Sequence, residues 1–274
     1  MKKPLRRTSP VTMTRMSSWT TLFGGYRHAV TEGRIERWLD QFAPEDRDCA
    51  VRLLDSVDFI TGDQIAAAYR SALPQLVGWD RAKSKRTGKW RFVPYSSSAG
   101  ESGGSMLHRF RMANGLGSTA FHELFIHKSE LLMENLESSD TVVFVDDFAG
   151  TGDQACNSWP EFQELLPGNP TSHLVLIAVT TRAAYRIQNE TGLVLNYGFM
   201  LNESDNVFSP KCKHFTPQEK DSILGYCTKA DKNSRRGYGD CGLILVFSHD
   251  CPTNSIPILH RFNTRWEGLF RRHI

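Results

Sequence analysis

The sequence of 274 residues lacks any long apolar run, which excludes a membrane-spanning helix from the expected structure. Its longest apolar runs, residues 174–179 and 242–247, are far shorter than the ~18 residues that such a helix needs. Cysteine is scarce, with six residues and no CxxC pair, so a disulfide scaffold is not expected. We therefore predict a cytoplasmic protein with reduced thiols and no membrane partner.

Clusters of metal-ligating residues are also missing from the sequence. The nine histidines form no spaced group with the cysteines, which argues against a structural zinc site. Neither Cys156 nor Cys212 has a histidine at helical spacing, so a thiol nucleophile is not expected.

Acidic residues are absent from the first 31 residues, which hold six cations. Because the whole chain has a net charge of +3, the remainder carries −3 and is not a basic body of the kind that coats nucleic acid. We predict a basic flexible arm over residues 1–30. Its composition fits a mobile terminus, a contact with nucleic acid or with an acidic partner surface, or an organelle address.

A second basic run covers residues 81–91, with six cations in eleven residues. The run directly precedes a predicted strand. It is interpreted either as a solvated loop or as a site for the phosphate groups of a nucleic acid or a polyphosphate substrate.

Hydrophobic periodicity predicts an α/β protein with an N-terminal helical region over residues 31–89. From residue 90 to residue 274, β-branched runs alternate with helical patterns, which indicates a mainly parallel central sheet flanked by helices. The expected strands are residues 90–95, 141–145, 173–179, 194–200 and 243–247. The expected helices are residues 34–57 in two parts, 61–76, 106–113, 121–136, 155–166, 183–189 and one after a capping box at Thr216.

The segment with the clearest chemistry is a buried strand, residues 142–145, that is followed directly by Asp146 and Asp147. A turn with Gly150 and Gly152 then leads into a helix, and such a turn lets backbone N–H groups approach a phosphate. The two carboxylates can accept hydrogen bonds from vicinal hydroxyls or help to hold Mg²⁺ near a pyrophosphate. One short loop therefore offers acceptors for a ribose and donors for its 5′-phosphate.

Two other motifs that place an acidic or glycine-rich loop after a strand do not fit this segment. A P-loop requires a Gly-Lys-Ser/Thr ending, which is absent. A haloacid dehalogenase strand requires Asp-x-Asp, but Phe148 stands two places after Asp146. A plain strand–turn–helix with an acidic pair at the sheet edge remains the structural alternative.

The segment resembles the PRPP-binding motif of the type I phosphoribosyltransferase family. The resemblance is carried by residues 142–145, the two aspartates, Ala149, Thr151 and Gly152. It departs at Gln154, where the family usually has Thr or Ser. The motif implies that PRPP or a nucleotide binds here with Mg²⁺ as a cofactor.

The resemblance also implies the role of each site residue. Asp146 and Asp147 are the expected catalytic and metal-binding residues. The 5′-phosphate is expected on Ala149, Gly150, Thr151, Gly152, Asp153 and Gln154. The loop of residues 96–104 matches the pyrophosphate loop, with Ser97, Ser98 and Gly100 as its expected donors. Arg182, after the next strand, is expected either to approach the base or pyrophosphate or to form a surface salt bridge.

A closer resemblance covers roughly residues 30–260. Residues 34–42, 46–54, 102–104 with 109–114, and 254–257 are similar to phosphoribosyltransferase-like proteins of bacterial conflict systems. That group implies an effector in anti-phage defence of the retron type, with an ATPase, a reverse transcriptase or a non-coding RNA or DNA as expected partners. The alternatives that remain are a catalytically silent nucleotide-sensing or assembly subunit and a nucleic-acid-binding subunit.

Overall fold

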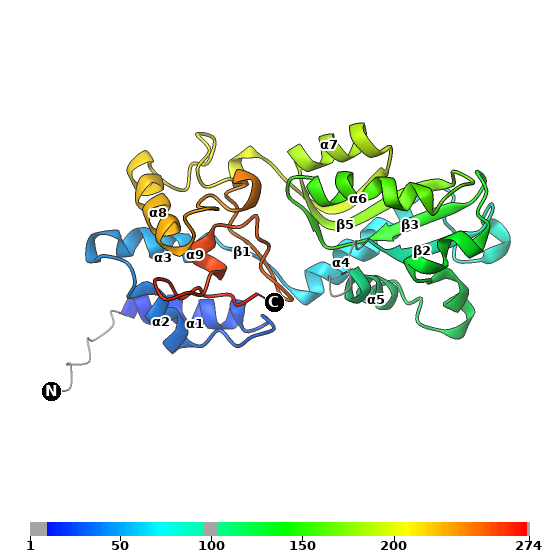
Figure 1. The fold of residues 1–274 in the computed structure, drawn as a ribbon. Coiled ribbons are helices and arrows are strands. Elements are labelled where there is room, and N and C mark those ends of the chain that lie inside the picture. The colour runs from blue at the N-terminus through cyan, green and yellow to red at the C-terminus, as the bar shows by residue number, and fades with distance from the viewer. Residues whose placement is uncertain (1–9, 96–102, 273–274) are drawn as a thin grey trace. The chain divides into compact units, whose positions relative to one another are not determined.

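The computed structural model describes residues 10–95 and 103–272, with side chains from residue 14 onward (Figure 1). The chain divides into two compact units, one of residues 1–62 with 203–274 and one of residues 63–202. These bounds differ from the expected division at residues 30 and 89, because residues from both ends of the chain fold together. Within the described residues, no helix is long and apolar enough to cross a membrane.

The unit of residues 63–202 is built on a parallel sheet, as predicted. Strand β2 pairs with β3, β3 pairs with β5, and β5 pairs with β6, all in parallel. A two-residue strand, β4, pairs with β5 beyond the end of β3. The strands are β2 (Trp90–Pro94), β3 (Thr141–Val145), β4 (Phe148–Ala149), β5 (Thr171–Thr180) and β6 (Val194–Leu201).

Helices cover both faces of this sheet (Figure 1). Because alternate strand residues point to opposite faces, Val142 and Phe144 pack on one side, in a core cluster with residues of α6 and α7. Phe92 faces the other side, where its ring lies 5.3 Å from that of Phe110 in α5. The four helices are α4 (Gly62–Ala72), α5 (Gly103–Ala113), α6 (Asp153–Glu164) and α7 (Thr181–Thr191).

The central position of β3 in this arrangement determines its burial. All five residues of β3 are buried, as expected for a parallel strand with helices on both faces. The predicted fold class, an α/β protein with a mainly parallel central sheet flanked by helices and with an N-terminal helix, is therefore confirmed.

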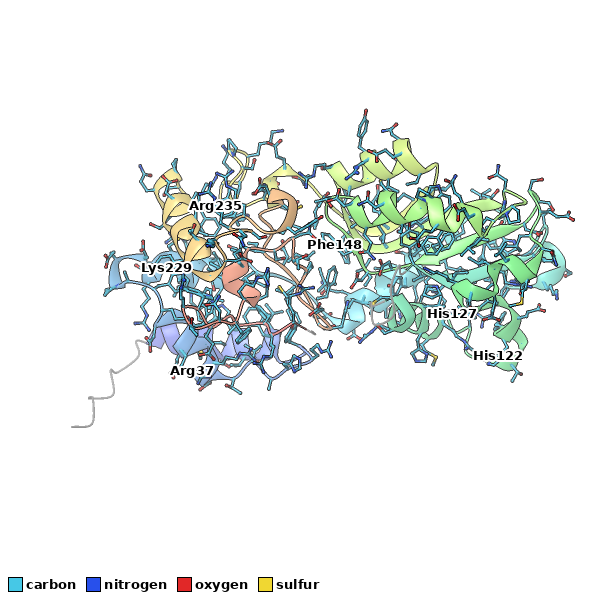
Figure 2. All side chains as sticks on the ribbon, viewed as in Figure 1. Arg37, His122, His127, Phe148, Lys229 and Arg235 are labelled. Carbon is cyan, nitrogen blue, oxygen red and sulfur yellow. The ribbon has the colours of Figure 1, made fainter. Side chains whose placement is uncertain are left out.

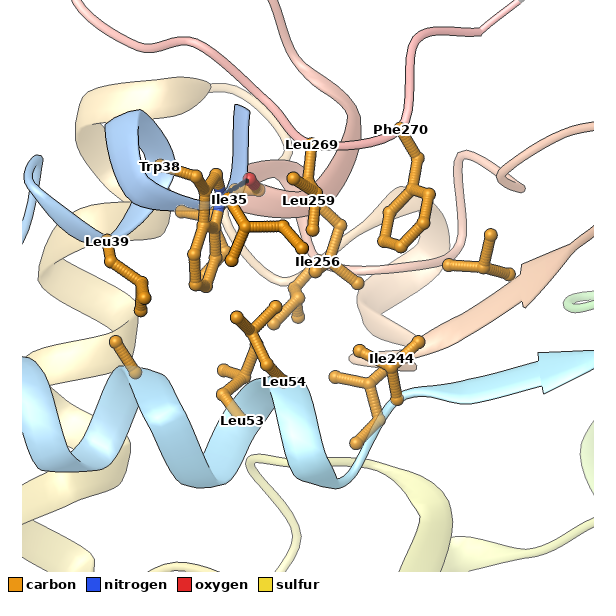
Figure 3. Packing of buried hydrophobic residues seen from close by; sticks show 14 of the residues in the cluster. Ile35, Trp38, Leu39, Leu53, Leu54, Ile244, Ile256, Leu259, Leu269 and Phe270 are labelled. Atoms are coloured by element: carbon orange, nitrogen blue, oxygen red, sulfur yellow. Dashed lines mark hydrogen bonds between the residues drawn. The ribbon is translucent and has the colours of Figure 1, made fainter. Parts of the chain in front are cut away.

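The unit of residues 1–62 and 203–274 is mainly helical, with one small sheet. Strand β1 pairs with β7 in parallel, so the predicted strand 243–247 lies here and not in the central sheet. Side chains such as Trp38, Leu53 and Leu259 fill its core (Figure 3). Its elements are α1 (Pro10–Phe23), α2 (Glu32–Leu39), α3 (Arg47–Asp55), β1 (Asp58–Ile60), α8 (Pro217–Ala230), β7 (Leu245–Phe247) and α9 (Pro257–His260).

The structure also contains short 3-10 helices, and two of them replace a predicted α-helix. Residues 121–136 form no single helix, because Phe125 pairs with Phe92 and the N–H of Ile126 donates to the Phe92 carbonyl. Figure 2 labels His122 and His127, which lie on and beside these turns. The 3-10 helices are Pro44–Asp46, Leu73–Gln75, Lys83–Lys85, Thr119–Leu124, Lys128–Glu134, Glu203–Asp205 and Tyr238–Asp240.

The expected flexible arm is partly helical. Residues 10–23 form α1, and Met16, Trp19 and Phe23 are buried in the core of their unit. The buried residues recur every three or four positions, so one face of the helix packs inward. The prediction of a flexible arm over residues 1–30 is therefore wrong for residues 10–23, and residues 1–9 lie outside the described residues.

A buried histidine in this unit makes the stability of the fold depend on pH. His260 is 5% exposed, and its Nε2 lies 3.1 Å from the Ser255 carbonyl oxygen. Burial, with a further contribution from Arg272, lowers the pKa of His260 to about 3, against the opposing effect of the Ser255 hydrogen bond. Arg261 adds to the lowering and Asp231 opposes it. The folded protein therefore keeps His260 neutral, whereas the unfolded chain takes up a proton near pH 6.5.

This difference predicts a pH-dependent stability. Because the folded pKa lies below the unfolded one, the contribution of His260 is present above pH 6.5 and is lost as the pH falls toward 3. Between pH 7 and pH 5 the loss is about 2 kcal/mol. His260→Gln keeps a donor for Ser255 but does not titrate. Denaturant unfolding should show that wild type loses about 2 kcal/mol of unfolding free energy relative to the variant when the pH is lowered from 7 to 5. An equal difference in unfolding free energy at both pH values would contradict this.

Candidate functional site

The acidic pair lies on the main-chain ladder of the sheet. Val145 is opposite Val175 in β5, and Phe148 is opposite Ala178, so the register is the same before and after the two aspartates. The Asp146 N–H donates to the Val175 carbonyl at 3.0 Å. The Asp147 carbonyl accepts hydrogen bonds from the N–H groups of Ile177 and Ala178 in β5, at 2.9 and 3.1 Å. The backbone of both aspartates is therefore fixed by pairing with the central strand.

Asp146 is also held by hydrogen bonds outside the sheet. It is 5% exposed, and its Oδ1 accepts a hydrogen bond from the Asp147 N–H at 2.9 Å. Its carbonyl accepts a hydrogen bond of 2.9 Å from the hydroxyl of Tyr69 in α4. Burial, together with the charges of Asp147 and Asp146, raises the pKa of Tyr69 well above its usual value, so its hydroxyl stays a donor. Asp147 itself is half-buried.

The turn after the aspartates is anchored to helix α7. The hydroxyl of Thr180 donates to the Gly150 carbonyl at 2.7 Å and accepts from the Ala183 N–H at 3.1 Å. Gly152 has φ +80°, and a Cβ on it would lie 3.4 Å from both the Ala183 carbonyl oxygen and a side-chain atom of Ile187. Glycine is thus needed here both for its backbone conformation and for close packing.

Helix α6 begins at this turn and presents its amino end there. Its first intrahelical bond runs from the Cys156 N–H to the Gly152 carbonyl, at 2.9 Å. The Asp153 N–H donates to the Thr151 hydroxyl oxygen at 3.1 Å. The next two N–H groups, of Gln154 and Ala155, have no acceptor within the helix. Donors of this kind, together with the helix dipole, suit an anion such as a phosphate.

The surrounding topology also points to this edge of the sheet. After β2 the chain continues to α5 on one face, and after β3 it continues to α6 on the other face. In open α/β sheets, ligands bind beyond the carboxyl ends of strands at such a change of face. Asp146, Asp147 and the glycine turn lie at this point.

Most of the sequence-predicted site residues lie together. Arg182 is exposed near the start of α7, which follows β5 at the same sheet edge. Phe148, labelled in Figure 2, is half-buried in the short strand β4, between the aspartates and the turn. Ser97, Ser98 and Gly100 lie outside the described residues. Eight of the predicted site residues lie within residues 146–154 at the sheet edge: Asp146, Asp147, Ala149, Gly150, Thr151, Gly152, Asp153 and Gln154.

Three supporting residues were not predicted from the sequence. Tyr69 and Arg186 contact the loop from distant parts of the chain, and no local pattern marks them. Thr180 could have been found, since a threonine between a strand and a helix is a common N-cap residue.

The basic run of residues 81–91 is engaged within its own unit. Arg81 donates to the carbonyls of Asn114 and Gly115, and Lys83 pairs with Glu123 at 2.7 Å. The others also have partners: Lys85 pairs with Asp80, Arg86 lies over the Trp79 ring, Lys89 donates to the Glu134 carbonyl and Arg91 pairs with the Glu134 carboxylate. These contacts favour the interpretation as a surface loop over that as a phosphate site.

The acidic pair offers oxygen atoms of the kind that bind Mg²⁺. Within residues 10–95 and 103–272, no group of three or more His, Cys, Asp or Glu side chains could hold a metal ion without help. Magnesium is commonly bound by one or two carboxylates, with water and substrate phosphates completing its shell. Asp146 and Asp147 supply such carboxylates, so the donor set fits a Mg²⁺ ion that enters with a phosphorylated ligand.

The Thr180 hydroxyl generates a stability prediction. Thr180→Val keeps the shape of the side chain but removes the bond to Gly150 and the helix cap at Ala183. We expect the variant to lose about 1–2 kcal/mol of unfolding free energy, as for other lost caps and buried hydrogen bonds. Thr180→Ser keeps the hydroxyl and serves as the control. Equal stability of the valine and serine variants in denaturant unfolding would disprove the anchoring role.

Comparisons with curated proteins and with solved structures give no match. A family model, PRTase-CE, matches residues 35–272. This match covers most of the chain and includes the acidic pair, the glycine turn and the sheet that holds them. The chain therefore belongs to the PRTase-CE family, a phosphoribosyltransferase-like family.

Proposed function

We propose that the chain binds a ligand with a ribose 5-phosphate group, either PRPP or a nucleotide, together with Mg²⁺. A phosphoribosyltransferase-like function is supported by the family match. The observation that carries the more specific proposal is the run from Asp146 to Gly152. It combines two aspartates whose backbone is fixed by the sheet with a glycine turn and a helix amino end at one sheet edge.

The proposed reaction is phosphoribosyl transfer or cleavage of a nucleotide at C1 of the ribose. Such a reaction needs no protein nucleophile, because the bond at C1 breaks through a cation-like sugar and an acceptor then attacks. The protein has to position the ribose, hold the phosphates and limit access of water. When bound, Mg²⁺ would neutralise and orient the leaving pyrophosphate.

Each part of the loop has a role in this proposal. The carboxylates of Asp146 and Asp147 accept hydrogen bonds from the ribose hydroxyls and contribute oxygen ligands for the metal. The backbone from Ala149 to Asp153, the Thr151 hydroxyl and the N–H of Gln154 hold the 5′-phosphate. Arg182, at the neighbouring loop, supplies a positive charge for the leaving group or an acceptor.

A catalytically silent nucleotide-sensing or assembly subunit is the second candidate. Gln154 favours it, because the related motif usually has a hydroxyl side chain at this position. The Gln154 side chain is exposed at the start of α6. A glutamine in place of the family's Thr or Ser therefore leaves the turn itself intact. This candidate shares the binding site but not the turnover.

Calorimetry with PRPP and nucleoside monophosphates, with and without Mg²⁺, tests the binding. We expect wild type to bind at least one of these ligands, with affinity that depends on Mg²⁺. Asp146→Asn combined with Asp147→Asn should weaken binding about 100-fold or more, because two charge-assisted contacts are lost. Glu137→Gln with Glu164→Gln is the control, since it changes the net charge equally at two exposed acids away from the loop.

Two results would decide between the candidates. Binding of none of the ligands by folded wild-type protein would contradict the proposal. Release of pyrophosphate or of a free base by wild type, and not by the double aspartate variant, would exclude the silent subunit.

We also propose a role in bacterial anti-phage defence, with an ATPase, a reverse transcriptase or a non-coding nucleic acid as partner. The support is the resemblance of residues 34–42 and 254–257, among others, to conflict-system proteins. On this proposal the site alters a nucleotide pool or a nucleic acid during infection.

Phage challenge of bacteria that express the chain with its neighbouring genes tests this role. We expect wild type to protect and the double variant Asp146→Asn/Asp147→Asn to lose at least 10-fold in protection, because both carboxylates would be needed at the ribose. Immunoblots must show equal amounts of the two proteins. Equal protection by the two proteins would contradict the catalytic effector and favour the binding subunit.

A further inference from the structure

The proposed phosphate-binding loop contains a negatively charged side chain, Asp153, which would disfavour binding of a phosphate. Asp153 is the first residue of α6 after its N-cap, Gly152. A carboxylate at this position is attracted to the helix amino end and its free N–H groups. It would therefore compete with a ligand phosphate for the same donors, and it would also repel that phosphate.

The structure pairs this carboxylate with a cation from another helix. Arg186 Nη1 of α7 donates to Asp153 Oδ1, and both side chains are about one-third exposed. The Nε of Arg186 donates to Glu190 Oε1 at 2.9 Å. Hydrogen bonds to Glu190 and Asp153 raise the pKa of Arg186, so the guanidinium stays charged.

The position of Arg186 is fixed relative to the loop. Arg186 lies one residue before Ile187, and Ile187 and Ala183 are the residues against which Gly152 packs. The cap of the same helix, Thr180, holds the Gly150 carbonyl. The helix that supports the turn is therefore also the helix that supplies the neutralising charge.

We propose that Arg186 is a positioning residue that holds and neutralises the Asp153 carboxylate, so that the amino end of α6 can accept a ligand phosphate. The inference rests on the proposed function and specifies how the phosphate part of that site is controlled. Arg186 acts through Asp153 and not by direct contact with the reacting atoms. Its removal should therefore matter only while residue 153 carries a charge.

A double-mutant cycle tests this dependence, with Mg²⁺ and PRPP as the probe and calorimetry as the readout. The proteins are wild type, Arg186→Gln, Asp153→Asn and the double variant. Arg186→Gln should weaken binding about three- to tenfold, the range expected for an uncompensated charge at a helix amino end. In the Asp153→Asn background, the same change should shift the affinity less than about twofold.

Glu190→Gln provides the matched control, because it removes the other carboxylate partner of Arg186 and leaves the pair with Asp153 in place. We expect its affinity to stay within about twofold of wild type. Thermal unfolding of each variant separates a loss of fold from a loss of charge compensation. The effect of Arg186→Gln should also decrease as salt rises, since salt screens partly exposed charges.

The outcomes are distinct. Equal affinity of wild type and Arg186→Gln overturns the inference but leaves the proposed function in place. An equally large effect of Arg186→Gln in both backgrounds also overturns it and assigns Arg186 a role independent of Asp153. Binding of PRPP by none of the proteins, wild type included, contradicts the proposed function and this inference together.

Discussion

The parallel pairing of residues 141–149 with residues 171–179 is the constraint on which the candidate site depends. The pairing keeps one register through β3, the two aspartates and β4. Because the backbone N–H of Asp146 and the carbonyl of Asp147 belong to this ladder, neither aspartate can shift without loss of sheet hydrogen bonds. The acidic pair is thus held in place by the core before any ligand arrives.

Because Asp146 is buried, it depends on hydrogen bonds from neighbouring groups. Asp146 is 5% exposed, and a buried carboxyl group needs hydrogen bonds because transfer of a polar group out of water is costly. The Asp147 N–H meets part of that need, and Tyr69 fixes the carbonyl of the same residue. These supports come from the neighbouring aspartate and from α4, so Asp146 is held on two sides.

Helix α7 provides the second half of the site. It anchors the glycine turn through Thr180, packs closely on Gly152 and places Arg186 beside Asp153. Anchoring and charge compensation therefore come from the same element. Acceptors for hydroxyls at one end of the loop and donors for an anion at the other end are what a ribose 5-phosphate requires.

Local patterns accounted for much of this structure. The β-branched run of β3, the acidic pair and the glycine turn were evident because they are contiguous, and the Thr216 capping box marked the start of α8 correctly. Tyr69 could not be predicted, since it reaches Asp146 from 77 positions away. Pairing of β1 with β7 likewise joins residues 58–60 with residues 245–247, which no local periodicity encodes. The failure at residues 10–23 has a different cause, because basic and polar composition concealed the buried Met16, Trp19 and Phe23.

Amide hydrogen exchange with and without PRPP and Mg²⁺ tests the central claim most directly. The N–H groups of Gln154 and Ala155 have no acceptor within α6, so they should exchange readily in the free protein. Slower exchange in residues 146–156 on addition of the ligand is the result that a ribose 5-phosphate site predicts. Protection confined to other segments, with residues 146–156 unchanged, would contradict the assignment of this loop as the binding site.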